Sequence, residues 1–335
     1  MAYKIAVVGA GMFGTAMANI AGENGYSVSL WARDEEQVKS MIETGENAKY
    51  LPGYPLHSRI RPSGNLHETL HGARIVFMSV PSSSIREVAR MAASSIESGA
   101  MVISTTKGVE PDGFYLMSEV LGEELSGVSI GVLSGPNLAE EIMQKQITAT
   151  VIASKSTDLI ETVQKILHTS YFRLYSSDDV YGVELAGALK NVYAIAAGFA
   201  AALGVGSNTM GVLVTRSLAE MSRFAHAMGA RPMTFMGLAG IGDLLVTCTS
   251  PLSRNYQIGY LIGQGLNLDA AQSRLGKLAE GVNTVRILKS KAAEMEVYMP
   301  LVNGLYDILF TSRSVDEVIY EMMMAEQPSD VEFVT

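Results

Sequence analysis

Short runs of apolar residues recur along the first half of the chain, separated by longer stretches of mixed polar and apolar residues. Short apolar runs cover residues 3–8, 27–31, 74–80, 101–104, 128–133 and 148–153, and several of the stretches between them have helical patterns. Short apolar runs bounded by turn residues are typical of buried strands. Strands that alternate with helices are typical of a parallel sheet with crossover connections. The pattern therefore predicts an α/β fold that begins with a doubly wound sheet.

The strand pattern ends near Ser177. From there to the C-terminus the sequence is rich in Ala, Met and Leu and reads as helical. A chain of 335 residues is long enough for two cores, at roughly 100 to 200 residues per domain. We therefore predict a sheet domain over residues 1–177 and an all-α domain over residues 178–335.

A glycine-rich turn directly follows the first predicted strand. Gly9, Gly11 and Gly14 have the spacing GxGxxG, and a helix-compatible stretch of small residues follows them. In dinucleotide-binding folds the first glycine makes the tight turn, the second admits the pyrophosphate and the third lets the helix approach the strand. The phosphates then lie at the helix N-terminus. Its place between strand and helix favours a Rossmann-like NAD(P) site over a purely structural turn.

The end of the second predicted strand bears on the choice of cofactor. An NAD site has a carboxylate there for the ribose 2′-hydroxyl, but this chain reads Ala32-Arg33-Asp34. Arg33 is suited to pair with a 2′-phosphate, which favours NADP. Asp34 either takes the NAD role after a shift of two residues or caps the helix that starts at Glu35. We predict NADP as the preferred cofactor, with NAD tolerated.

One lysine stands out in the predicted helical half. Residues 184–207 form a long apolar run in which only Lys190, Asn191 and the Tyr193 hydroxyl offer polar chemistry. A lysine in such a run either extends along the helix surface to water or is buried with a charged partner. Because burial disfavours the charged form of an ammonium, a buried lysine is suited to proton transfer. Lys190 is therefore a candidate general acid/base.

Polar residues also follow two later strands of the predicted sheet. Lys107 follows one strand, while Gly135 and Asn137 follow another, so all three lie at the carboxyl edge where doubly wound sheets bind ligands. Lys107 is a candidate to meet a phosphate or the substrate carbonyl, against the alternative of a solvated loop lysine. Asn137 is a candidate ligand contact or the cap of a helix beginning at Leu138.

A second dense cluster covers residues 237–255. Its glycines allow close backbone approach, and hydroxyl, carboxylate, guanidinium and amide groups follow within a few positions. Asp243 is a candidate charge partner for Lys190, and Arg254 is suited to bidentate recognition of a phosphate. Taken singly, a helix-capping aspartate and a surface arginine are the alternatives. Their appearance together beside glycines and hydroxyls favours a site.

Composition narrows the functional classes. A net charge of −9 argues against a broad nucleic-acid-binding surface, and the single Cys248 excludes an internal disulfide. The five histidines show no metal-ligand spacing. The first apolar stretch reads as a strand rather than a leader, and no membrane span is expected. These features indicate a cytoplasmic enzyme without a metal, without nucleic-acid or integral membrane contacts, and compatible with a homodimer.

The motifs taken together resemble those of the bacterial-type NAD(P)-dependent glycerol-3-phosphate dehydrogenase family over nearly the whole chain. In the family's order stand the Gly-Ala-Gly-x-x-Gly turn, Leu30-Trp31, Asn47 with Leu51-Pro52, Lys107-Gly108, Ser134-Gly135-Pro136, Leu189-Lys190-Asn191, Gly206 with Asn208, residues 243–255 and Glu280-Gly281. Related β-hydroxyacid dehydrogenases share the first glycines and a lysine but not the 243–255 segment. The set as a whole is therefore specific.

The resemblance implies a Rossmann-like domain followed by an all-α domain of the 6-phosphogluconate-dehydrogenase type. It also implies reversible reduction of dihydroxyacetone phosphate to sn-glycerol 3-phosphate for phospholipid synthesis. Lys190, Asp243 and Lys107 match catalytic positions. The implied substrate contacts are Lys107, Gly135, Asn137, Lys190, Asn191, Asp243, Ser253, Arg254 and Asn255. The implied cofactor contacts are Gly9, Gly11, Met12, Phe13, Gly14, Arg33, Lys107, Ala139, Arg254, Leu278 and Glu280.

One departure from the family and two alternative functions remain. The family often has Ser followed by Trp or Tyr where this chain has Met12-Phe13, so a serine contact to the pyrophosphate is lost and backbone N–H groups must supply it. A related dehydrogenase acting on a hydroxy acid or a sugar phosphate is the nearer alternative. A catalytically silent NADP sensor is the further one, but it would have lost Lys190 or Asp243, and both are present.

Overall fold

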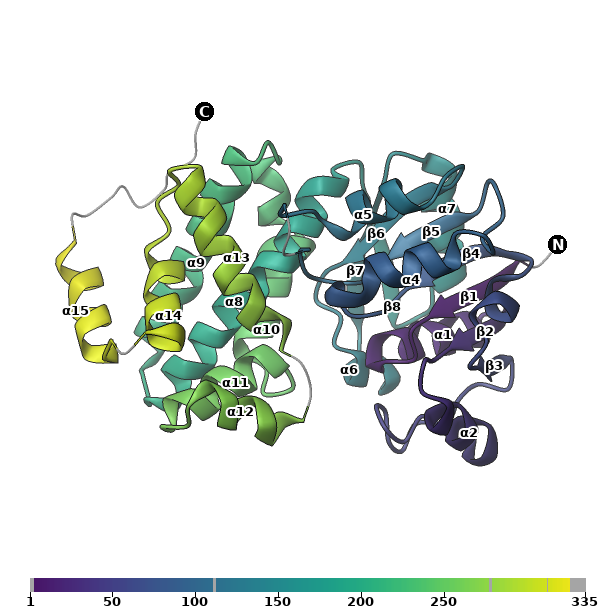
Figure 1. Ribbon diagram of the computed structural model, residues 1–335, viewed down its shortest axis with the longest axis horizontal. Coiled ribbons are helices and arrows are strands. Elements are labelled where there is room, and N and C mark those ends of the chain that lie inside the picture. Colours follow the sequence, from purple (N-terminus) through teal and green to yellow (C-terminus); the bar gives the residue numbers. More distant parts are fainter. Residues whose placement is uncertain (1–2, 111–112, 277–278, 312, 326–335) are drawn as a thin grey trace. The chain divides into compact units, whose positions relative to one another are not determined.

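The computed structural model describes residues 3–110, 113–276, 279–311 and 313–325 (Figure 1). The chain divides into two compact units: Met1–Glu110 with Tyr115–Glu184, and Pro111–Phe114 with Leu185–Thr335. The division falls within helix α8 (Val180–Ala202), which begins in the first unit and continues in the second. The first unit holds the strands, and the second is helical.

The first unit is built on one sheet. Among its described residues, eight strands follow the order β3-β2-β1-β4-β5-β6-β7-β8, and every neighbouring pair is parallel except β6 with β7. The strands are β1 (Lys4–Val8), β2 (Ser27–Trp31), β3 (Ile60–Ser63), β4 (Ala73–Met78), β5 (Met101–Ser104), β6 (Ser129–Ser134), β7 (Thr148–Ser154) and β8 (Phe172–Ser177). The helices are α1 (Met12–Glu23), α2 (Glu35–Thr44), α3 (Leu66–Leu70), η1 (Ser82–Ser84), α4 (Ile85–Ala92), α5 (Met117–Glu124), α6 (Ala139–Met143) and α7 (Thr157–Leu167). The predicted α/β class and doubly wound sheet are confirmed.

Helices cover both faces of this sheet. Along β1, Ile5 and Val7 point into one core and Ala6 and Val8 into the other, and all four are fully buried. The first core is completed by α1, α2, α6 and α7, and the second by α3, α4 and α5. A strand buried on both faces reads as a continuous apolar run rather than an alternating one, which is the pattern that the sequence shows.

Two features of the sheet differ from the sequence prediction. β7 runs antiparallel to β6. The connection between them, residues 135–147, contains the short helix α6, and antiparallel neighbours can be joined without the helical crossover that a parallel pair needs. The edge strands β3 and β8 were not predicted. Pro62 and Arg61 interrupt the apolar pattern of β3, and proline is tolerated in a sheet chiefly at an edge.

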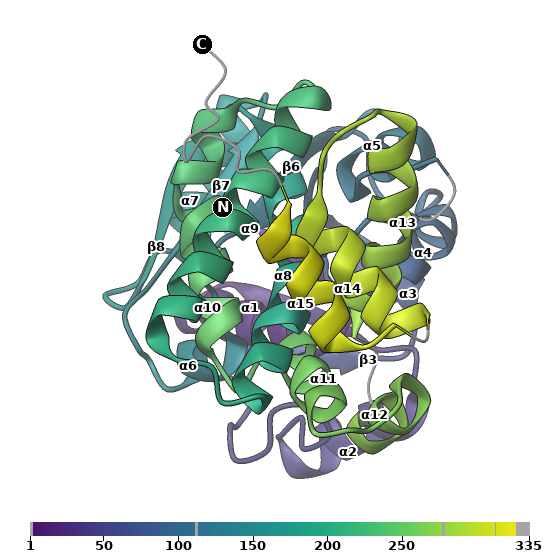
Figure 2. The same ribbon diagram turned by 90° about the vertical axis from the view of Figure 1, so that its left-hand side faces the viewer.

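The second unit is a group of helices around the C-terminal part of α8 (Figure 2). Its other elements are α9 (Ser207–Ala227), η2 (Pro232–Met236), the π-helical turn η3 (Leu238–Gly242), α10 (Asp243–Thr249), α11 (Arg254–Gly263), α12 (Leu268–Leu275), α13 (Glu280–Glu294), α14 (Pro300–Phe310) and α15 (Val315–Met324). α13 packs on α14, and α14 on α15. Within its described residues this unit contains helices and no strand, as predicted.

Helix α8 passes close to α11 because both helices carry glycine at the crossing. A Cβ on Gly198 would lie 1.9 Å from the carbonyl oxygen of Tyr256, and one on Gly259 would lie 1.9 Å from that of Ile195. α8 has 23 residues and is apolar enough to cross a membrane by length and composition, but 78% of its most apolar window is buried within the protein. It is the core helix that presents Lys190 and Asn191.

Candidate active site

The glycine-rich turn between β1 and α1 has the geometry that a dinucleotide needs. Gly9 has φ +117°, and a Cβ there would lie 2.5 Å from the carbonyl oxygen of Ser79. A Cβ on Gly14 would lie 2.1 Å from the carbonyl oxygen of Gly9, so only glycine lets helix and strand meet this closely. No heavy atom lies within 4 Å of a Cβ built on Gly11, which leaves room for a pyrophosphate. The three positions therefore fit NAD(P).

Met12 and Phe13 occupy the first positions of α1. Gly11 is the N-cap and makes no side-chain cap hydrogen bond. The first N–H groups of a helix have no partner within the helix, and they point at whatever binds there. With methionine in place of a serine, these backbone N–H groups are the donors that residues 11–14 offer to a phosphate.

The ribose end of the predicted cofactor site carries two ion pairs. Asp34 caps α2 by accepting hydrogen bonds from the N–H groups of Glu36 and Gln37, so the predicted helix cap is formed. Lys49 pairs with Asp34 at 2.7 Å, and this hydrogen bond holds the pKa of Asp34 below its usual value. Arg33 is exposed and lies 3.2 Å from Glu87. The charge of Asp34 is thus balanced by a lysine.

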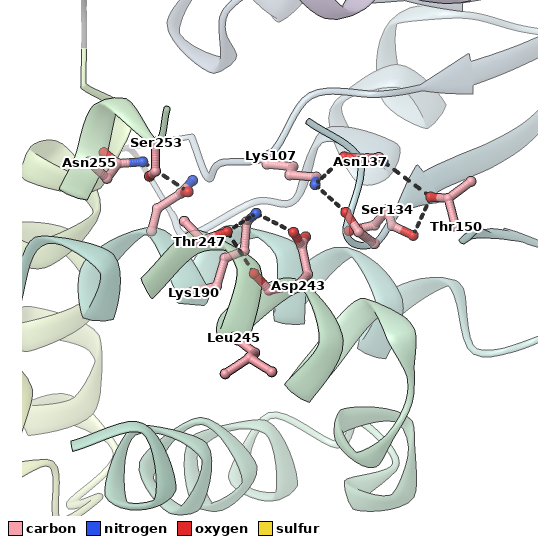
Figure 3. A network of polar contacts seen from close by, with 12 residues as sticks. Lys107, Ser134, Asn137, Thr150, Lys190, Asp243, Leu245, Thr247, Ser253 and Asn255 are labelled. Atoms are coloured by element: carbon pink, nitrogen blue, oxygen red, sulfur yellow. Dashed lines mark hydrogen bonds and ion pairs between the residues drawn. The ribbon is translucent and has the colours of Figure 1, made fainter. Parts of the chain in front are cut away.

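Lys107 is held in a polar network at the carboxyl edge of the sheet (Figure 3). Its ammonium donates to the carbonyl oxygen of Gly135 at 3.0 Å and to Oδ1 of Asn137 at 2.9 Å. The Asn137 amide donates to the hydroxyl of Thr150, which donates to the carbonyl oxygen of Ser134. α6 begins at Ala139 with Leu138 as N-cap, so the expectation that Asn137 caps this helix is wrong. Lys107 is half-buried and positioned, not a freely solvated lysine.

Lys190 and Asp243 form a buried ion pair in the second unit (Figure 3). The ammonium of Lys190 also donates to the hydroxyl of Thr247 at 2.6 Å, and that hydroxyl donates to the carbonyl oxygen of Asp243 at 2.6 Å. All three residues are at least 94% buried. The same pair influences the thiol of Cys248, whose pKa burial raises to about 12. The arrangement fixes an ammonium group in an apolar core.

Local backbone structure explains how Asp243 reaches this position. The π-helical turn Leu238–Gly242 precedes α10, and π-turns are frequent at functional sites. Gly240 allows the turn to pack against η2, since a Cβ there would lie 2.0 Å from the carbonyl oxygen of Phe235. Asp243 then starts α10, and Thr247 lies one turn later on the same face. Sequence reasoning missed Thr247, although its i,i+4 spacing from Asp243 was a usable signal.

Three segments meet around Asn191. The amide of Asn255 donates to Oδ1 of Asn191 at 2.9 Å, and Oδ1 of Asn255 accepts from the N–H of Gly281 at 3.0 Å. A side chain on Gly281 would collide with Asn191 and Asn255. Ser253 caps α11 by accepting from the N–H of Tyr256, and Arg254 is its first residue. The structure therefore brings α8, α11 and the start of α13 together at the predicted substrate-contacting amides.

Three predicted cofactor contacts remain, and the structure places two of them. Ala139 is the first residue of α6, Glu280 is the first residue of α13, and Leu278 lies outside the described residues. Within the part of the chain that the structure describes, no group of three or more His, Cys, Asp and Glu side chains could hold a metal ion.

A buried carboxyl group lies elsewhere in the helical unit. Glu220 on α9 accepts hydrogen bonds from the Tyr193 hydroxyl at 3.2 Å and from the N–H groups of Leu301 at 2.6 Å and Val302 at 3.3 Å. Burial raises the pKa of Glu220 to about 7, although these donors and the charge of Arg223 act in the opposite direction. Glu220 joins α8 and α9 to the N-terminus of α14.

The raised pKa of Glu220 predicts a pH dependence of stability. Between its usual value of 4.5 and about 7, the folded state holds a proton that the unfolded state releases. The free energy of unfolding should therefore fall as pH rises through this window, by roughly 3 kcal/mol for a group that titrates alone. Denaturant unfolding at pH 5 and pH 8 should show a smaller fall for Glu220→Gln than for wild type, while the exposed Glu294→Gln should behave as wild type. If the free energy of unfolding fell as much in Glu220→Gln as in wild type, the pH dependence would not come from Glu220.

Comparison with known proteins identifies relatives over nearly the full chain. Residues 4–160 match the model of the NAD-dependent glycerol-3-phosphate dehydrogenase N-terminus, and residues 179–320 match that of the C-terminus. A glycerol-3-phosphate dehydrogenase (NAD(P)+) of Ectopseudomonas mendocina is 54% identical, covering 98% of this chain and 97% of its own. One of Saccharophagus degradans is 52% identical, covering 98% and 92%. The crystal structure of the Coxiella burnetii glycerol-3-phosphate dehydrogenase superposes with a TM-score of 0.93 at 34% identity, covering 97% of this chain and 99% of that one.

Proposed function

Because this chain belongs to the NAD-dependent glycerol-3-phosphate dehydrogenase family, we propose that it reversibly reduces dihydroxyacetone phosphate to sn-glycerol 3-phosphate with NAD(P)H. The family membership supports the substrate and the reaction, and the geometry of the glycine-rich turn supports the dinucleotide. The single observation that carries the mechanism is the buried ammonium of Lys190, held by Asp243 and Thr247.

When bound, NAD(P)H supplies the hydride that adds to C2 of the ketone. Lys190 donates a proton from Nζ to the carbonyl oxygen as negative charge develops there, which converts C=O to C–OH. In the oxidation direction the neutral amine of Lys190 removes the hydroxyl proton. An ammonium has three N–H donors, and Asp243 and Thr247 engage two of them, so the third is assigned to the substrate oxygen.

Asp243 and Thr247 orient the acid/base without reacting themselves. The carboxylate of Asp243 offsets the desolvation cost of burying the ammonium charge in the core. The Thr247 hydroxyl is itself fixed by the carbonyl oxygen of Asp243, so it serves as an acceptor for Lys190. A donor held in advance loses less freedom when the reaction occurs.

Predicted phosphate and polyol contacts complete the proposal. Arg254 binds the substrate phosphate. The buried side-chain amides of Asn191, next to Lys190 on α8, and of Asn255 on α11 offer hydrogen bonds to the substrate. Lys107, Gly135 and Asn137, which share one hydrogen-bond network, are also proposed to contact the substrate, and Lys107 to contact the cofactor as well.

The activity is tested directly with purified protein. Oxidation of NADPH and of NADH is followed by absorbance with dihydroxyacetone phosphate as the substrate, and with a 2-keto acid of similar size as the comparison. We expect turnover that requires the phosphorylated ketone. Equal or greater turnover of the keto acid would favour a related hydroxyacid dehydrogenase instead.

We further propose that Arg33 makes NADP the preferred cofactor. A charge-assisted contact with the 2′-phosphate is worth about 1.5 to 3 kcal/mol, or roughly ten- to a hundredfold in preference. Lys49 balances the charge of Asp34, and Arg33 would exchange its exposed pairing with Glu87 for the phosphate. Arg33→Ala should lower kcat/KM for NADPH far more than for NADH, and exposed Arg61→Ala should lower neither. Equal losses with both cofactors would mean that Arg33 contacts the adenine or only supports the fold.

The cellular role follows from the product. sn-Glycerol 3-phosphate is the backbone precursor of phospholipids, so the reduction direction would supply phospholipid synthesis. We propose a cytoplasmic enzyme that acts on small soluble substrates, in keeping with the burial of the long apolar helix α8.

A further inference from the structure

We propose that Gln37 and Asn47 are positioning residues for the dinucleotide site. Their buried side-chain amides hold the carbonyl groups of the 9–14 turn, so that the turn's N–H groups face the pyrophosphate. The inference rests on the proposed binding of NAD(P), and it names two side chains outside the glycine motif on which that binding depends.

The carbonyl oxygen of Ala10 is the centre of the arrangement. It accepts a hydrogen bond from Nε2 of Gln37 at 2.8 Å and one from Nδ2 of Asn47 at 2.9 Å. The second N–H of Gln37 goes to Oδ1 of Asn47 at 3.1 Å, so the two amides also orient one another. Both side chains come from outside the turn: Gln37 from α2, and Asn47 from the segment that follows α2.

The next carbonyl group is fixed through Thr15. The second N–H of Asn47 donates to the Thr15 hydroxyl at 2.8 Å, and that hydroxyl donates to the carbonyl oxygen of Gly11 at 2.8 Å. The backbone N–H of Thr15 also donates to the same oxygen at 3.0 Å. Asn47 therefore acts on two successive peptide groups.

Peptide geometry links these carbonyl contacts to the phosphate. In a planar trans peptide, C=O and N–H point in opposite directions. Drawing the Ala10 carbonyl toward the amides turns the N–H of Gly11 away from them, and holding the Gly11 carbonyl does the same for the N–H of Met12. Because residue 12 is methionine and has no hydroxyl, the phosphate relies on such N–H donors, and their direction matters more.

Burial indicates that these amides have a purpose beyond filling space. Asn47 is completely buried and Gln37 is 8% exposed, on the same face of α2 as the apolar Val38 and Met41. A buried amide costs free energy unless its donors and acceptors are matched, and an apolar residue would fill the position on α2 without that requirement. Here all four amide N–H groups are used, three of them on the turn or on Thr15.

The test is a double-mutant cycle read by cofactor binding rather than by turnover. Gln37→Met and Asn47→Ala each leave one amide donor on the Ala10 carbonyl, whereas the double variant leaves none. Titration of NADPH, NADH and ADP-ribose should show about threefold weaker binding for each single variant and about a hundredfold weaker binding for the double variant, which is more than the roughly tenfold product of the singles. Loss should be equal for all three ligands, since all contain the pyrophosphate.

Controls separate positioning from general destabilisation. Gln164→Met removes an amide contact of the same kind, to the carbonyl oxygen of Leu174 in the same unit, and should bind all ligands as wild type. KM for dihydroxyacetone phosphate at saturating cofactor should stay unchanged in Gln37→Met. Wild-type affinity in the double variant, or a loss confined to NADPH, would overturn the positioning role. Absence of NADPH and ADP-ribose binding in wild type would instead overturn the proposed function.

Discussion

Replacing Lys190 by alanine is expected to lower kcat by about 10² to 10⁴-fold while leaving NADPH binding intact. The variant loses the proposed proton donor to the substrate oxygen, whereas the glycine-rich turn proposed to bind the dinucleotide belongs to a different unit of the chain. Lys190→Arg should also fail, because a guanidinium does not release its proton near neutral pH. A buried Asp243 without its partner will lower stability as well, so binding is measured alongside turnover.

The informative measurement is kcat at saturating dihydroxyacetone phosphate together with the dissociation constant for NADPH. Lys291→Ala is the matched control, since Lys291 is a lysine of the same unit that pairs with Glu294 on one helix. The control should keep wild-type kcat. Near-normal kcat in Lys190→Ala would remove Lys190 from the mechanism, whatever the activity of the protein.

Arg254→Ala is expected to lower kcat/KM for dihydroxyacetone phosphate by about ten- to a hundredfold, mainly through KM. Arg254 is exposed at the first position of α11, and its neighbours Ser253 and Asn255 are buried and hydrogen-bonded. The guanidinium is thus carried on a fixed backbone, and the start of a helix also favours an anion. Arg254→Lys should lose less, because an ammonium keeps the charge but not the planar fork.

The comparison substrate for this prediction is unphosphorylated dihydroxyacetone. Wild type should prefer the phosphorylated ketone strongly, and Arg254→Ala should lose most of that preference. Arg274→Ala, an exposed arginine at the end of α12, should retain it. If Arg254→Ala discriminates between the two ketones as well as wild type does, the phosphate is bound by another group.

Much of the sheet could be read from the sequence because its central strands are buried on both faces. β1, β2 and β5 begin and end within a residue of the predicted runs, since a continuous apolar run needs a fully enclosed strand. β3 and β8 escaped prediction because an edge strand is only partly enclosed and accepts Pro62, Arg61 or Arg173. The direction of β7 is set by its pairing with β6, which the local pattern of apolar residues does not reveal.

Site residues could be predicted from the sequence where a charged side chain stands among apolar neighbours. Lys190 is conspicuous because a charge buried in an apolar helix needs a partner of opposite charge. Its predicted pairing with Asp243, which lies 53 positions further along the chain, is confirmed. No such contrast marks Thr247, Lys49 or Gln37, because threonine, lysine and glutamine are common in amphipathic segments. Apart from the i,i+4 spacing of Thr247 and Asp243, the partners of these residues lie far from them along the chain, so the contacts with Lys190, Asp34 and Ala10 form only on folding.

The sequence by itself determined which groups are available for the proposed chemistry: a glycine turn for a dinucleotide, a lysine and an aspartate for proton transfer, and an arginine for a phosphate. These features are local, since each depends on residue type and short spacing. The tertiary structure decided which groups hold them in place. Gln37 and Asn47 fix the peptide groups of the turn, Lys49 balances Asp34, and Thr247 completes the contacts of Lys190. Hydrogen bonds need partners within about 3 Å, and only the packed chain brings such partners together.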